Sequence, residues 1–175
     1  MRQSALLAAG LAALAAPASA EVKSAAPGGF EVESRAIVAA NAAQTYAALG
    51  RIAEWWNGEH TYSGDAANLR LEARAGGCFC ETIPKGGGSI EHMRVVYAQP
   101  GVTLRLQGGL GPLQQYGVAG TLTWSLKPAA NGTAITQTYV VGGYIPGGAD
   151  KLAPMVDKVL AEQLGRLQKR LGPGR

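Results

Sequence analysis

Charged residues are scarce in this sequence, at 16% of 175 residues, and basic residues exceed acidic ones by only four. The basic side chains are scattered, and their densest cluster, Arg166 to Arg170, falls on the polar side of an expected helix. Proteins that bind nucleic acids usually gather such charges into one patch. We therefore expect no nucleic-acid partner. The hydrophobic content of 47% is also too high for a disordered chain.

Long apolar runs are missing after the first twenty residues. Arg2 precedes the apolar run from Ala5 to Ala16, and small residues at Ala18 and Ala20 fit a signal-peptidase site. The run is too short to cross a bilayer of ~30 Å as a stable helix. We expect residues 1–20 to be a signal peptide cleaved after Ala20, and the protein to be periplasmic or secreted without stable membrane insertion. Residues 21–29 resemble a flexible lead-in.

Cysteine is rare: Cys78 and Cys80 are the only two. Side chains two residues apart in a regular strand are separated by roughly 6.6 Å, twice the rise per residue. A disulfide needs Cβ atoms ~3.5–4.5 Å apart. Unless a bulge bends the strand, we expect no bond between the two thiols, which would instead pack as small buried groups.

Glycine and proline are plentiful, with 25 and 9 residues, and they punctuate short alternating runs typical of strands. Such short connections favour antiparallel neighbours. The expected strands are residues 30–38, 69–74, 78–83, 89–98, 102–107, 117–127 and 133–143.

Helices are expected in three places. Asn41 can cap a short helix that ends at Gly50, and a second short helix carries Ile52, Trp55 and Trp56. Leucine and valine at three- and four-residue intervals predict a long amphipathic helix over about 150–171. These elements indicate an α+β fold with one domain over 30–171 and a short tail over 172–175.

Several segments resemble the START-like (SRPBCC) superfamily, in the branch of polyketide cyclase-like proteins and homologues of the activator of the Hsp90 ATPase. They are Trp55-Trp56 to Asp65, Ala75 to Phe79, Glu91 to Tyr97 and the terminal helix. The resemblance implies a helix-grip fold, in which a curved seven-stranded antiparallel sheet wraps around the C-terminal helix and encloses a cavity for an apolar ligand.

An ATPase activity is not expected, because Gly86-Gly87-Gly88 lacks the following lysine of a phosphate-binding loop and lies in a hairpin. An Hsp90 cochaperone role does not fit an exported protein. No cofactor is expected.

The hairpin of strands 78–83 and 89–98 predicts which side chains face inward. Opposite residue numbers that sum to 173 would pair Cys80 with Met93, Cys78 with Val95, and Glu81 with His92. We then expect Cys78, Cys80, Met93, Val95 and Tyr97 to face the helix or cavity and His92 to face outward. A metal site built from Cys78, Cys80 and His92 is therefore not predicted.

The loop over 57–67 holds the weak catalytic candidates His60, Tyr62 and Asp65, which could perform acid-base chemistry at a cavity mouth. Activation of a cysteine by His60, oriented by Asp65 or Glu59, is a further alternative. The loop can equally be an ordered lid without chemistry. The predicted ligand-binding residues are Trp56, His60, Tyr62, Cys80, Met93, Tyr97, Tyr116, Gln137 and Tyr139.

The favoured function is an exported, monomeric protein that binds a small hydrophobic or amphipathic molecule between sheet and helix. One alternative is a cyclase- or hydrolase-type enzyme that uses His60, Tyr62 or Asp65. A second alternative is a partner-binding protein without a ligand, which would need an exposed apolar patch on the outer sheet face.

Overall fold

The computed structural model describes residues 19–174, so most of the expected signal peptide lies outside the described residues. The prediction of a flexible lead-in over 21–29 is wrong. Strand β1 (Ser19–Ala26) pairs antiparallel with β2 (Gly29–Val38) through the turn at Pro27-Gly28. Because nearly every side chain of β1 is exposed, the strand has no alternating apolar face that sequence analysis could detect.

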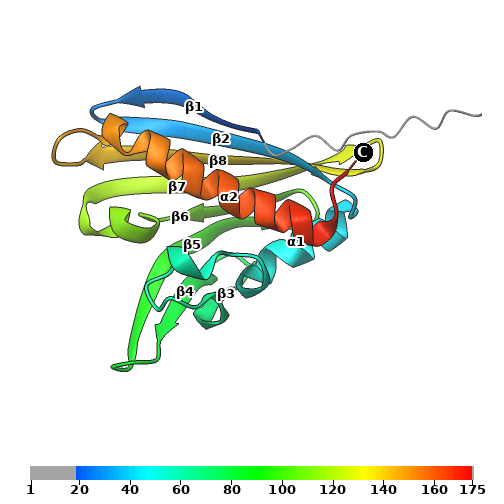
Figure 1. Cartoon of the computed structure of the whole chain (residues 1–175), viewed down its shortest axis with the longest axis horizontal. Helices are drawn as coiled ribbons and strands as arrows, with labels where there is room; N and C mark the ends of the chain where they lie inside the picture. Colours follow the sequence, from blue (N-terminus) through cyan, green and yellow to red (C-terminus); the bar gives the residue numbers. More distant parts are fainter. Residues whose placement is uncertain (1–18, 175) are drawn as a thin grey trace, which may run out of the picture.

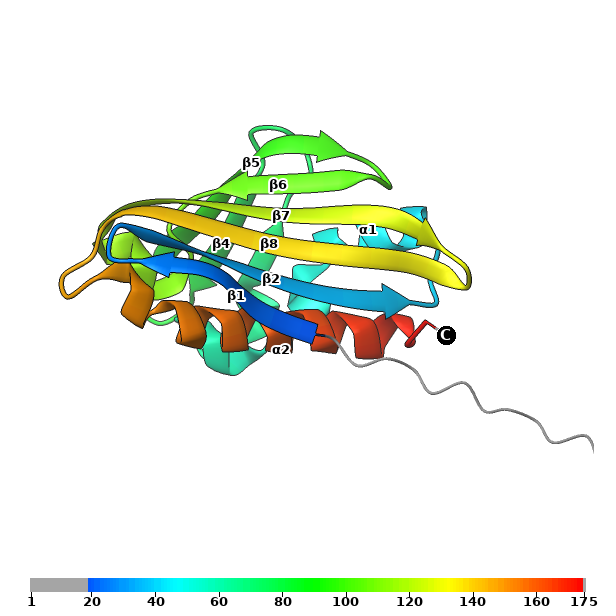
Figure 2. The ribbon, with the colours of Figure 1, turned by 90° about the horizontal axis from the view of Figure 1, so that it is seen from above.

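One sheet of eight antiparallel strands contains every strand of the described chain, and it is strongly curved (Figures 1 and 2). Its order is β1-β2-β8-β7-β6-β5-β4-β3, so the last two strands in the sequence lie in the middle. Strand β1 accounts for the difference from the seven strands expected. The other strands are β3 (Leu69–Leu71), β4 (Cys78–Ile83), β5 (Gly88–Gln99), β6 (Thr103–Gln107), β7 (Gly117–Ala129) and β8 (Gly132–Tyr144).

The first helix, α1 (Ala42–Gly50), begins at a capping box in which the Asn41 side chain accepts from the Gln44 amide. Short 3₁₀ turns follow it: η1 (Ile52–Glu54), η2 (Gly58–His60) and η3 (Ala66–Asn68). A further 3₁₀ segment, η4 (Gly111–Gln115), connects β6 to β7.

The long helix α2 (Ala153–Leu171) follows a 3₁₀ turn, η5 (Ala149–Lys151). Pro154 lies in its first turn, where the missing amide hydrogen needs no helical partner. The helix lies along the concave face of the sheet (Figure 1) and packs most closely on β2 and β1. This arrangement confirms the α+β helix-grip fold. None of the helices described is long and apolar enough to cross a membrane.

The hydrophobic core lies between α2 and the sheet. Leu160, Leu164 and Leu167 of the helix are fully buried against side chains such as Trp124 of β7. Trp55 packs edge-on against Trp124, with ring centroids 6.3 Å apart. The core extends from Leu49 of α1 to Ile145 and Ala149, which lie just before α2, and the cavity described next borders it.

Candidate functional site

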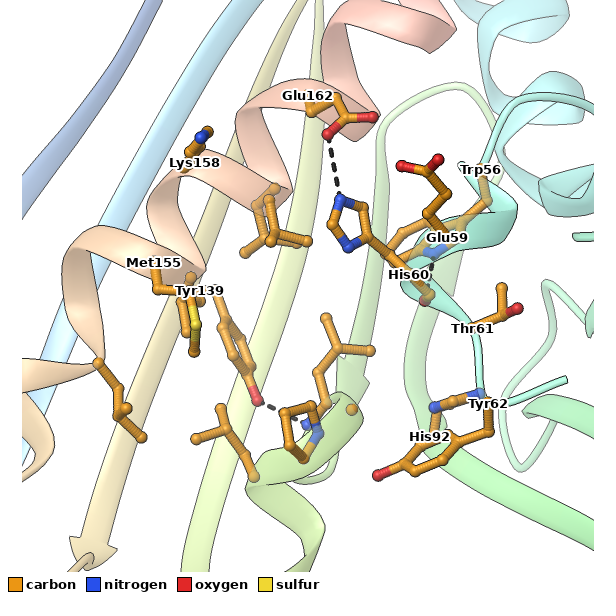
Figure 3. Close-up of a pocket in the computed structure, with 18 of the residues that line it drawn as sticks. Trp56, Glu59, His60, Thr61, Tyr62, His92, Tyr139, Met155, Lys158 and Glu162 are labelled. Atoms are coloured by element: carbon orange, nitrogen blue, oxygen red, sulfur yellow. Dashed lines mark hydrogen bonds and ion pairs between the residues drawn. The ribbon is translucent and has the colours of Figure 1, made fainter. Parts of the chain in front are cut away.

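A cavity of about 670 Å³ lies between α2, the sheet, η4 and the loop over 55–62. Most of its walls are apolar, and its polar groups come from the loop, from the exposed side of α2 and from β5 (Figure 3). The lining residues are Trp56, Glu59, His60, Thr61, Tyr62, Leu69, Phe79, His92, Leu110, Gly111, Pro112, Leu113, Tyr116, Tyr139, Leu152, Met155, Val156, Lys158, Val159, Leu160 and Glu162.

The two adjacent tryptophans have different environments, as neighbours on one turn must. Trp55 belongs to the core, whereas Trp56 lines the cavity, packs against Phe79 with ring centroids 5.5 Å apart, and donates its indole N–H to the His60 carbonyl at 3.1 Å. That hydrogen bond holds η2 over the cavity. Asn57 supports the same turn, because its side-chain oxygen accepts from the Glu59 amide.

The loop is fastened to α2 by polar contacts. The backbone nitrogen of Asn57 donates to the Gln163 side-chain oxygen at 2.7 Å, and the side-chain nitrogen of Asn57 donates to a Glu162 carboxylate oxygen at 2.6 Å. His60 Nε2 lies 3.1 Å from the other Glu162 oxygen (Figure 3). The hydrogen bond from Asn57, followed by that of His60, lowers the pKa of the Glu162 carboxyl below its usual value. Glu162 is therefore an anionic group at the cavity rim.

His92 lies inside the fold and lines the cavity, which makes the prediction that it faces outward wrong. The reason is a bulge. Phe79 pairs with Met93, but Cys80 pairs with Glu91, so His92 is an extra residue on β5. At a bulge two consecutive side chains oppose one, and here His92 and Met93 are both buried. The register expected from a constant sum of 173 is wrong along the whole hairpin, because paired residue numbers sum to 172 before the bulge and to 171 after it.

Glu81 accompanies His92 inside the fold. His92 Nε2 lies 2.8 Å from the Glu81 carboxylate, which also accepts the backbone amides of Tyr62 at 3.1 Å and Ser63 at 2.5 Å. Burial raises the pKa of Glu81, but the hydrogen bonds from Ser63, Tyr62 and His92 outweigh it and the net pKa is lowered. Burial lowers the pKa of His92 more than Glu81 raises it. An ionised Glu81 beside a neutral His92 follows.

Aromatic rings surround this histidine. The Tyr62 ring stacks on the imidazole at a centroid distance of 6.0 Å and an interplanar angle of 27°. The Phe79 ring lies 5.0 Å away at 39°. Tyr62 itself is half exposed, so its ring covers one face of the buried imidazole and also contacts solvent.

Tyr139 forms the central wall of the cavity. Its hydroxyl donates to the Gly108 carbonyl at 3.0 Å and accepts the Leu110 amide at 2.9 Å. Burial raises the pKa of this phenol to about 12, so it stays protonated. It positions the segment leading into η4, which carries Leu110 and Leu113 to the cavity.

Of the predicted ligand-binding residues, Trp56, His60, Tyr62, Tyr116 and Tyr139 line the cavity. Met93 is buried in the core beside it. Gln137 is also buried, but its amide is occupied by bonds from the Trp124 indole at 2.8 Å and to the Leu160 carbonyl at 3.0 Å. It therefore joins sheet to helix away from the cavity lining.

Tyr97 faces outward and is 45% exposed, contrary to expectation. A second bulge between Val95 and Tyr97 reverses the alternation of β5 there. Asp65 also lies off the cavity, where its carboxylate caps η3 by accepting the Ala67 amide at 2.9 Å. The structure thus brings His60 and Tyr62 to the site without Asp65.

Cys78 and Cys80 form a disulfide, so the prediction of separate thiols is wrong. The Cα–Cα distance between them is 5.4 Å, which is shorter than the roughly 6.6 Å of a regular strand and within the range that a disulfide spans. The cysteines also face away from the cavity, because Phe79 and Glu81 take the inward positions. Cys80 is therefore not a cavity residue. Glu91, rather than His92, is the side chain beside the two sulfurs.

Sequence analysis missed His92, Lys158 and Glu162 as cavity residues, and Glu81 as the buried partner of His92. Lys158 and Glu162 are four residues apart on α2, a spacing that places them on one face of the helix. The regularly spaced leucine and valine residues of the helix did not indicate that the face with Lys158 and Glu162 borders a cavity. Glu81 and His92 were visible in the sequence as acid-base side chains on adjacent strands. Glu81 faces inward with Phe79 because the register differs from the expected one, and His92 faces inward because of the bulge.

A curved sheet gripping a long helix, with an apolar cavity between them, defines a START-like protein. The chain belongs to the family described as polyketide cyclase / dehydrase and lipid transport, whose sequence model matches residues 29–172. No curated protein matches the sequence.

Solved structures share the fold at low sequence identity. An uncharacterized protein from Rhizobium leguminosarum has a TM-score of 0.60 and 18% identity, with 89% of this chain and 98% of that chain covered. CalU16 from Micromonospora echinospora has a TM-score of 0.56 and 13% identity, with coverages of 84% and 77%. The di-domain ARO/CYC StfQ of the steffimycin biosynthetic pathway has a TM-score of 0.54 and 15% identity, with coverages of 83% and 51%.

Proposed function

We propose that this protein binds a small hydrophobic or amphipathic molecule in the cavity between sheet and α2. The observation that carries the proposal is the cavity itself, at about 670 Å³ and with mainly apolar walls. Cavities of ~300–1,000 Å³ suit single small ligands. Water in such a space makes few hydrogen bonds with the walls, so an apolar ligand that replaces it gains free energy.

The few polar groups support an amphipathic ligand with a defined orientation. Glu162, His60 and Lys158 lie at the rim on the loop and on α2, whereas Tyr139 and Leu160 line the interior. A ligand can therefore keep a polar end near the rim and bury an apolar body. The contacts of Asn57 with α2 hold the loop over 55–62 against the helix at the edge of the cavity.

A fluorescent apolar probe, N-phenyl-1-naphthylamine, tests the proposal. Val156→Phe adds a ring inside the cavity, whereas Val140→Phe adds the same ring at an exposed position of β8. We expect saturable binding to the wild type, affinity weakened roughly tenfold by Val156→Phe through lost apolar contact, and no change with Val140→Phe. Absence of saturable binding, or equal binding by both variants, would contradict a ligand-binding cavity.

An enzyme of the cyclase or hydrolase type is the second candidate. It is favoured by the family description and by the presence of His60 and Tyr62 at the cavity. Asp65 is not part of this candidate site, because it caps η3. For any compound that the protein is found to convert, His60→Ala should lower turnover, and unchanged turnover would eliminate His60 as the acid-base group.

We also propose export of the protein and action as a monomer. The support for export is the sequence of the first twenty residues, and cleavage after Ala20 would leave Glu21–Ala26 of β1 able to pair with β2. The mass of the mature protein from its own host tests cleavage. Light scattering of the purified protein tests the monomer.

A further inference from the structure

The buried pair of Glu81 and His92 leaves one nitrogen of the imidazole without a partner. His92 is 4% exposed and lines the cavity, and its Nδ1 has no hydrogen bond with any described residue. Buried polar atoms of this kind are rare, since a missing hydrogen bond costs free energy. An unpartnered nitrogen in the wall of a ligand cavity indicates where a ligand group would bind.

The surroundings fix which nitrogen of His92 carries hydrogen. Glu81 receives two backbone amide hydrogens and is ionised, so it can only accept. His92 Nε2, 2.8 Å from this carboxylate, must therefore be the donor. In a neutral imidazole the other nitrogen, Nδ1, then has a free lone pair.

A second polar group of the cavity wall, the hydroxyl of Tyr139, is already occupied. The Tyr139 hydroxyl both donates to Gly108 and accepts from Leu110. The Tyr62 ring stacks on one face of the imidazole of His92, and the lone pair of the buried Nδ1 lies in the ring plane, so a donor would have to approach at the ring edge. The cavity thus presents a buried acceptor without a protein donor.

We infer that the ligand class is a hydroxylated one: a flat or aliphatic apolar molecule with an alcohol, phenol or enol O–H that donates to His92 Nδ1. This inference rests on the proposed ligand-binding function and names its selectivity. A methyl ether or unsubstituted analogue would leave Nδ1 unpartnered. Sites built to hydrogen-bond a hydroxyl reject analogues that lack it for this reason. His92 acts as a specificity-determining residue, and Glu81 is a positioning residue that sets its tautomer.

The probes 2-naphthol and 2-methoxynaphthalene are a matched pair: the first carries a hydroxyl hydrogen that can be donated to His92 Nδ1, and the second carries a methyl group in its place. We expect the wild type to bind 2-naphthol about three- to tenfold more tightly, the range of one net hydrogen bond. Because the chain contains two histidines, ¹⁵N spectra of the imidazoles can be assigned with His60→Gln. In the free protein, Nδ1 of His92 should have the shift of an unprotonated nitrogen, and 2-naphthol should move it.

Glu81→Gln tests the tautomer directly. Ser63 donates to Oε1 of Glu81, whereas Tyr62 and His92 share Oε2. A Gln oxygen in the Oε1 position would accept from Ser63 and leave the side-chain NH₂ to donate to Nε2 in place of accepting from Tyr62, so the hydrogen of His92 moves to Nδ1. We expect this variant to lose the preference for 2-naphthol. Glu91→Gln, the same substitution at an exposed position beside His92, should keep it.

The outcomes separate this inference from the function on which it rests. Equal affinity for the two probes in the wild type, or a protonated Nδ1 in the free protein, overturns the inference while the cavity function stands. If neither naphthalene nor N-phenyl-1-naphthylamine binds, the proposed function fails as well. Should Glu81→Gln not fold, the wild-type spectra and probe pair decide alone.

Discussion

The hydroxyl of Tyr139 lies 2.9 Å from the backbone nitrogen of Leu110, and this contact ties a central strand to the segment that closes one end of the cavity. The same hydroxyl donates to Gly108. Tyr139→Phe removes both hydrogen bonds and leaves the part-buried Leu110 amide and Gly108 carbonyl without this partner. We expect the free energy of unfolding in urea to fall by about 1–3 kcal/mol.

Tyr116→Phe is the matched control, because Tyr116 also lines the cavity but no hydrogen bond of its hydroxyl occurs within the described chain. Its unfolding free energy should change by less than about 0.5 kcal/mol. Equal losses for the two variants would contradict the role of Tyr139 as a tie between β8 and the η4 segment.

Gly120 makes room for the same hydroxyl. A Cβ atom at this position would overlap the Tyr139 hydroxyl and the Gly108 carbonyl. We therefore expect Gly120→Ala to lower the free energy of unfolding by about 1–3 kcal/mol through overpacking. Gly165→Ala in α2 meets open space and should instead stabilise the protein by up to about 1 kcal/mol. Urea unfolding of both variants checks the contrast, and a harmless Gly120→Ala would refute the close packing.

Acid should destabilise the protein through His92. Burial holds its folded-state pKa below the ordinary 6.5, so the unfolded chain takes up the proton first. The free energy of unfolding should therefore fall as the pH is lowered through 6.5 toward the folded value, with a slope of at most about 1.4 kcal/mol per pH unit from this group. Urea unfolding between about pH 7 and about pH 5.5 measures it.

Glu81 adds to the loss at lower pH. Its folded-state pKa is lowered, so its contribution is fully present above the ordinary 4.5 and disappears as the pH falls through the folded value. His92→Gln should abolish the step near pH 6.5, whereas His60→Gln should retain it, because His60 lies at the rim. A pH-independent wild type between pH 7 and about pH 5.5 would contradict the buried neutral imidazole.

The Cys78–Cys80 disulfide closes a very short loop and lies on the side of β4 away from the cavity. Loop-closure entropy for so few residues gives a stabilisation of about 1–2 kcal/mol. We expect reductant to lower the thermal midpoint of the wild type and to leave the double variant Cys78→Ser/Cys80→Ser unchanged. Two thiols that react with iodoacetamide in the native, unreduced protein would show that the bond is absent.

The periodic segments of the sequence predicted the fold well. Leu160, Leu164 and Leu167 in α2 and the alternating residues of β2 and β8 bury one face each, so their patterns carried the information. β1 was not predicted, because it pairs with β2 through backbone hydrogen bonds and its exposed side chains show no alternating pattern.

The candidate site was predicted only in part, and the bulges explain why. The aromatic residues Trp56, Tyr116 and Tyr139 lie where the sequence suggested, since their strands and turns are regular. One extra residue in β5 turned His92 inward, and another turned Tyr97 outward. Local alternation cannot reveal a bulge, because the bulge depends on pairing with a neighbouring strand.

Native mass spectrometry of the full protein purified from its own host tests the central claim most directly. A molecule held in the cavity should appear as a noncovalent adduct that is lost on denaturation. The adduct should be depleted in Val156→Phe, whose added ring occupies the cavity, and retained in Val140→Phe. Unliganded protein in every preparation, together with no saturable binding of N-phenyl-1-naphthylamine, would contradict a function based on ligand binding.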